Sequence, residues 1–160
     1  MLALQTLTFA GCGIMAFQDF KDREVTWVLF PILGLLMALL HLFHVEMTLF
    51  FVSVLGNVVV VSGILLILWA VTKYIFKKVF LNVSFGLGDV LFFYALALGF
   101  PTITFIYLLV GSICFSFVAF FLLNRFIKMK TVPLAGLMGI FLMAVTLLTL
   151  FPNTPSLYVI

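Results

Sequence analysis

The chain has 160 residues, of which 66% are hydrophobic and 8% are charged, with a formal net charge of +3. Its mean hydropathy of +1.43 lies far above that of a water-soluble domain and indicates an integral membrane protein with one domain over residues 1–160. The apolar runs are long and continuous, which argues against a transmembrane β-barrel. We therefore expect an all-α membrane protein, because a spanning helix satisfies its own backbone hydrogen bonds.

Six apolar segments follow one another, and most approach the roughly 20 residues that a spanning helix needs. The first segment begins without Lys or Arg, so we interpret it as a retained helix and not as a secretory signal peptide. The fourth is too short to span alone and is expected to end near Pro101, since proline disfavours a helical residue before it. The segments cover residues 2–17, 27–43, 47–71, 90–98, 102–123 and 132–151.

Every basic residue lies in the connection after the first, third or fifth segment, and the other connections and residues 152–160 have none. The positive-inside rule then places these three connections in the cytoplasm and both termini outside. The same placement explains a pI near 9.0 without a nucleic-acid partner. The basic residues are Lys21 and Arg23, then Lys73, Lys77 and Lys78, then Arg125, Lys128 and Lys130.

The third connection, over residues 73–83, mixes lysines with Tyr74, Phe76 and Phe80. One interpretation is a juxtamembrane segment whose lysines reach the lipid headgroups. The other is a mobile cover over an active site. The sequence leaves both open.

Asp89 stands out because a carboxylate beside so much apolar sequence is expensive and therefore suggests a functional site. Gly86 and Gly88 precede it and allow a sharp turn or a close approach of another chain. A second acidic cluster contains Asp19 and Asp22. The plain structural alternatives are a helix N-cap for Asp89 and a solvated loop charge for Asp19.

Asp19 and Asp89 are about 70 residues apart, but both are expected at cytoplasmic segment ends, Asp19 after the first segment and Asp89 before the fourth. An aspartic protease needs two carboxylates close enough to share one proton. One then acts as a base on water while the other, protonated, polarises the scissile carbonyl. Packing of the first and fourth segments side by side would bring these two carboxylates together.

These residues resemble a known family. Gly86-Leu87-Gly88-Asp89 matches the GxGD signature of membrane aspartyl proteases. The stretch from Asp19 to Val25 resembles the first-aspartate element of type IV prepilin peptidases and archaeal preflagellin peptidases. The resemblance implies that Asp19 and Asp89 are the catalytic pair. Asp22 is the less favoured substitute for Asp19, because it lies three residues further into the loop. We expect four residues to support substrate binding: Gly86, Gly88, Arg23 and Glu24.

The resemblance extends to the short fourth helix and to Val132-Pro133-Leu134-Ala135 opening the last segment. It departs from the family at Thr26, where proline is common, and at Val90-Leu91 after Asp89. No paired-cysteine insert or methyltransferase region is present, so the chain looks like the minimal, peptidase-only form without metal or organic cofactor.

By resemblance, the partners are the lipid bilayer and a prepilin-like or preflagellin-like precursor with a basic leader, and the expected location is the inner (cytoplasmic) membrane, multi-pass. The filament system, a bacterial or archaeal source and homo-oligomer formation stay open.

Two rival functions remain. A presenilin-like or signal-peptide-peptidase-like intramembrane protease also uses GxGD, but its first aspartate lies within a helix, whereas Asp19 is expected after one. A non-enzymatic scaffold or transporter component is the other rival, although the mid-segment positions hold no charged residue for ion coupling. We interpret His41, His44 and Glu46 as interfacial polar residues on the outer side, not as a metal site.

Overall fold

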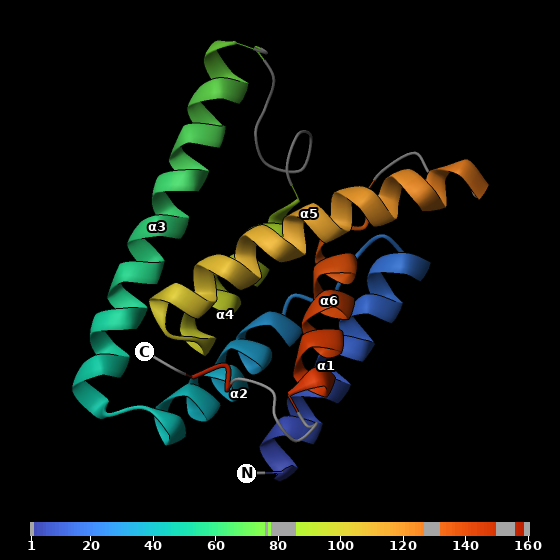
Figure 1. The fold of residues 1–160 in the computed structure, drawn as a ribbon. Coiled ribbons are helices and arrows are strands. Elements are labelled where there is room, and N and C mark those ends of the chain that lie inside the picture. The colour runs from blue at the N-terminus through green and yellow to red at the C-terminus, as the bar shows by residue number, and fades with distance from the viewer. Residues whose placement is uncertain (1, 76, 78–85, 127–131, 150–155, 159–160) are drawn as a thin grey trace.

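In the computed structural model, residues 2–75, 77, 86–126, 132–149 and 156–158 are described. These residues form six α-helices and no strand (Figure 1), which confirms the all-helical architecture. In chain order the helices are α1 (Leu2–Lys21), α2 (Leu29–His44), α3 (Met47–Tyr74), α4 (Leu87–Gly99), α5 (Thr102–Phe126) and α6 (Leu134–Leu148).

Two of the helices, α3 and α5, are long and apolar enough to cross a membrane. Only 11% and 22% of their most apolar windows are buried inside the protein. A core helix of a water-soluble protein would be mostly covered, so these exposed apolar surfaces fit contact with lipid. The general expectation of a helical membrane protein therefore has support, while six spans and the orientation of the termini stay predictions.

The fourth helix lies at the centre of the bundle and contacts α2, α3, α5 and α6. Its side chains Phe92, Phe93 and Leu96 are buried. It runs parallel to α2, because its start lies beside the start of α2 and its last turn lies beside the last turn of α2. It ends at Gly99, two residues before Pro101, which confirms the predicted short fourth helix and its stop.

Helices α1 and α6 pack against each other in opposite directions (Figure 1), so the end of α1 lies beside the start of α6. Glycines allow this close approach. A Cβ at Gly136 would lie 3.0 Å from the Cβ of Asp19 and 3.4 Å from the Cα of Ala16. Because the contact includes backbone, a larger residue at 136 would push the two helices apart.

Asp19 lies near a helix end, as predicted, but inside the last turn of α1 and not after the helix. Helix α1 continues through Asp19 to Lys21, and the N–H of Asp22 still donates to the carbonyl of Gln18 at 2.8 Å. Arg23, with φ of 59°, has the left-handed backbone that commonly ends a helix. The apolar run ends before the helix ends, because polar residues are also compatible with a helical backbone. Asp89 likewise lies inside α4, in its first turn, and not before the helix.

Most of the lysine-rich third connection, namely residues 76 and 78–85, lies outside the described residues, so its proposed covering role has no structural description here. Lys73 lies at the last turn of α3, with its Nζ 4.7 Å from the ring centre of Trp69 and 5.7 Å from that of Tyr74.

Candidate active site

The start of α6 binds both aspartates. The first N–H groups of any helix lack partners within the helix and carry a partial positive charge. The N–H of Gly136 donates to Oδ2 of Asp19 at 2.6 Å. Asp89 accepts hydrogen bonds from the N–H groups of Ala135 and Gly86. Carboxylates from α1 and α4 thus meet at two consecutive amides of a third helix.

The two carboxylates are close enough to affect each other's protonation. Burial, followed by the nearby charge of Asp19, raises the pKa of Asp89 to about 6, although the amides of Ala135 and Gly86 oppose the increase. Burial also raises the pKa of Asp19, opposed by the Gly136 N–H and by Arg23. Both residues lie outside α3 and α5 and outside the apolar runs. The pair therefore favours a state that retains a proton near pH 6.

Gly86 also serves this arrangement. It is the N-cap of α4, and Asp89 lies three residues later, so a side chain returning to the N-cap N–H resembles half of a capping box. A Cβ at Gly86 would lie 2.9 Å from Oδ2 of Asp89. Glycine at this position therefore leaves room for the carboxylate to turn back on its own helix.

The other supporting residues are not all at the pair. The charge of Arg23 acts on Asp19, so Arg23 belongs to the site. A Cβ at Gly88 would lie 3.1 Å from Cζ of Phe30, so Gly88 lets α4 pack on α2. Glu24 and Asp22 are exposed in the connection after α1. No substrate contact is described for any of them.

Ala135 and Gly136 are the functional positions to which the sequence assigned no role. Their main chain makes the contacts, so no side-chain chemistry marks them. The available signal was Pro133, followed after Leu134 by the small residues Ala135 and Gly136, since proline is frequent at helix starts and small residues leave the first amides accessible. That pattern predicts where a helix begins but not which carboxylates reach it.

The interpretation of His41 as an interfacial residue is wrong. Its side chain is fully buried, and its Nδ1 lies 3.1 Å from the carbonyl of Leu98 at the end of α4. The last carbonyls of a helix have no N–H partner within that helix, and the buried ring of His41 supplies one at the end of α4. His44 instead is exposed, with its ring stacked on Tyr158 at 4.2 Å. Within the described part of the chain, no three His, Cys, Asp or Glu side chains form a metal-binding group.

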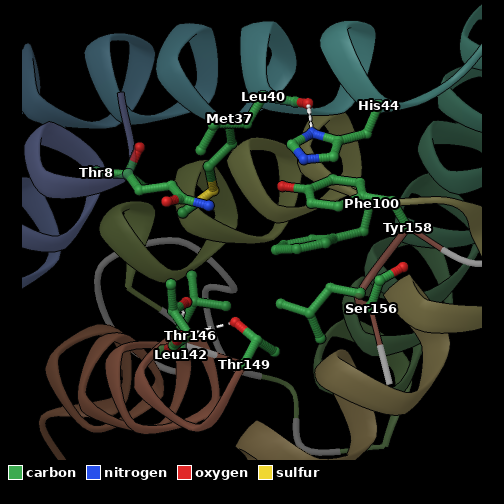
Figure 2. A pocket seen from close by; sticks show the side chains of 12 residues that line it. Thr8, Met37, Leu40, His44, Phe100, Leu142, Thr146, Thr149, Ser156 and Tyr158 are labelled. Atoms are coloured by element: carbon green, nitrogen blue, oxygen red, sulfur yellow. Dashed lines mark hydrogen bonds between the residues drawn. The ribbon is translucent and has the colours of Figure 1, made fainter. Parts of the chain in front are cut away.

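A cavity of about 210 Å³ lies at the other end of the bundle, between the start of α1, the ends of α2 and α6, and residues 156–158 (Figure 2). Hydroxyl groups line it, but those of Thr8, Thr146 and Thr149 donate to carbonyls of their own helices. Among the described residues that line this cavity there is no Asp, Glu, Lys or Arg. The aspartate pair therefore carries the stronger chemical signal.

Comparison with known proteins adds no assignment, since no family model, curated protein or solved structure matches this chain.

Proposed function

We propose that the chain is a membrane aspartyl endopeptidase that uses Asp19 and Asp89 to activate water. The observation that carries this proposal is the meeting of both carboxylates at the start of α6, where the charge of Asp19 contributes to the raised pKa of Asp89. Two half-buried carboxylates that share one proton are the functional groups of aspartic proteases.

The two carboxyl groups have different environments, and this suggests their roles. Asp19, held by the Gly136 N–H and by the charge of Arg23, is suited to remain the carboxylate that accepts a proton from water. Asp89, with its pKa of about 6, is suited to carry the shared proton and donate a hydrogen bond to the scissile carbonyl oxygen. Attack of the water oxygen gives a tetrahedral intermediate. Proton transfer from Asp19 to the amide nitrogen then releases the amine.

The substrate proposed is the basic leader of a type IV prepilin-like precursor, cleaved at the cytoplasmic face of the membrane. The resemblance of the two aspartate elements supports this class. Exposed Asp22 and Glu24 lie in the connection that follows Asp19, so they would attract a basic leader. Replacing both by lysine should slow cleavage at low salt more than at high salt. Equal rates at both salt concentrations would exclude this attraction.

The decisive experiment compares wild type, Asp19→Asn and Asp89→Asn in membranes with a prepilin-like substrate, with the leader detected by mass. Asparagine keeps the size of the side chain but cannot exchange the proton, so both variants should lose cleavage and still insert normally. Glu46→Gln is the matched control, because Glu46 is an exposed carboxylate at the start of α3 and has no proposed role in cleavage. Cleavage by either of the first two variants would refute the dyad.

One observation favours a second candidate. Asp19 lies within α1, and an aspartate within a helix is the feature expected of presenilin-like intramembrane proteases. These would cut inside a substrate's apolar helix. The same substrate tests this candidate, because the mass of the released fragment shows whether the cut falls at the leader junction or within the apolar helix.

A further inference from the structure

Helix α4 ends inside the protein, with its last residues largely covered by neighbouring elements. Gly99, Phe100 and Pro101 are buried. The last four carbonyls of a helix have no partner within that helix. Pro101 follows with no N–H to offer. The end of α4 therefore needs hydrogen-bond donors from elsewhere in the fold.

Side chains from two of the neighbouring helices, α2 and α3, supply these donors. Nδ2 of Asn57, on α3, donates to the carbonyls of Ala97 at 2.9 Å and Phe100 at 2.8 Å. Nδ1 of His41, on α2, donates to the carbonyl of Leu98 at 3.1 Å, since a carbonyl can only accept. Both side chains are fully buried.

Each of these side chains donates to a carbonyl of α4, and each also has one buried acceptor atom. Among the described residues, neither Oδ1 of Asn57 nor Nε2 of His41 has a hydrogen-bond partner. A buried acceptor without a partner is unfavourable, and an apolar side chain at position 41 or 57 would avoid it. The hydrogen bonds that these side chains donate to α4 thus explain why polar residues occupy positions 41 and 57.

We propose that Asn57, assisted by His41, is a positioning residue that fixes the depth and rotation of α4 and thereby the position of Asp89. Asp89 and Leu98 lie on one short helix, about 14 Å apart at 1.5 Å per residue. No proline interrupts α4 between them, so a shift at the capped end moves the other end. The predicted effect on cleavage rests on the proposed function, whereas the effect on geometry does not.

The test measures the proximity of positions 19 and 89 without catalysis. A background with Cys12→Ala and Cys114→Ser receives Asp19→Cys and Asp89→Cys, and a short thiol-specific cross-linker joins them in folded, detergent-purified protein. Adding Asn57→Leu should lower the cross-linking yield several-fold. Adding Ser62→Ala is the matched control, because it removes another α3–α4 contact, to Tyr94 Oη at 3.0 Å, without uncapping α4. Equal yields with and without Asn57→Leu would overturn the proposal.

A second measurement uses the native aspartates. Asn57→Leu should lower kcat on the order of 100-fold, as expected for a small misplacement of a reacting group, with KM unchanged. Ser62→Ala should leave both constants unchanged. If Asn57→Leu lowers the cross-linking yield but the wild-type protein cleaves no substrate, the positioning role is supported and the peptidase is refuted. If Asn57→Leu does not fold, His41→Phe replaces it, since phenylalanine removes one donor and keeps a ring beside Phe50.

Discussion

The start of α6 and the end of α4 solve the same physical problem with different side chains. Both are helix ends within the bundle, and both receive hydrogen-bond partners from two other positions in the chain. At the end of α4 the partners are a neutral amide and an imidazole. At the start of α6 they are two carboxyl groups that titrate.

This difference indicates function, because capping alone does not need two acids. Asparagine and serine cap helix starts about as well as aspartate, without a charge to bury. Two neighbouring carboxylates add desolvation and mutual repulsion, which appear as the raised pKa of Asp89. The start of α6 thus retains an arrangement that costs stability, as is frequent at active sites. The end of α4 is capped by neutral side chains and avoids the burial of charge.

Apart from replacement of the aspartates themselves, the largest effect at the aspartate end is expected from Gly136→Ala. The added Cβ would lie 3.0 Å from Oδ2 of Asp19, so the carboxylate or the helix must move. Cleavage should fall on the order of 100-fold, measured as kcat with a prepilin-like substrate. The matched control is Gly63→Ala, where a Cβ would meet nothing within 4 Å. That control should keep its rate and gain stability of about 1 kcal/mol, since alanine is the better helix former. Equal rates for both variants would show that the Asp19–Gly136 contact does not matter.

The sequence predicted the features that depend on local pattern. Six apolar segments indicated helices, and Pro101 indicated where the short one stops. The charge of Asp89 in an apolar setting drew attention to a position that the structure places beside Asp19. Each of these signals is contained in a few neighbouring residues.

What the sequence did not predict depends on contacts between distant positions. The partner of Asp19 is a main-chain N–H 117 residues away, and any residue type other than proline has such a group. His41 was misplaced for a related reason, because its burial follows from the donors that α4 lacks at its end. The extension of α1 through Asp19 was missed because hydropathy indicates apolar surface and not helical backbone.

A second prediction concerns stability and pH. The pKa of Asp89 is raised from 3.8 to about 6, so the folded protein binds this proton more tightly than the unfolded chain. The resulting stabilisation is complete below pH 3.8 and is lost as the pH rises through about 6. Asp89→Asn removes this dependence. Relative to wild type, it should therefore become more stable between pH 4 and pH 7, as measured by thermal unfolding in detergent. Ser62→Ala, which removes no titratable group, should run parallel to wild type. Parallel curves for wild type and Asp89→Asn would mean that the Asp89 carboxyl is not strained by its surroundings.

The smallest effect on catalysis is expected at the opposite end of the bundle, from Tyr158→Ala. The ring of Tyr158 stacks on His44 at 4.2 Å and on Phe100 at 5.8 Å. Each aromatic pair contributes about 0.5–1.5 kcal/mol beyond its buried area. Unfolding free energy should fall by at least about 2 kcal/mol, because the lost buried area adds to the two aromatic pairs. The value of kcat should be unchanged, because the aspartate pair lies at the far end of α1 and α6.

Tyr107→Ala is the control for this prediction, because Tyr107 is 76% exposed on α5. It should change neither stability nor kcat. If Tyr158→Ala instead lowers kcat as strongly as Gly136→Ala, the aromatic stack acts on Asp89 through Phe100 and the end of α4. The two helix ends would then form one coupled unit. An unchanged kcat leaves the chemistry at the start of α6, with Asn57 and His41 acting on it through the position of α4 alone.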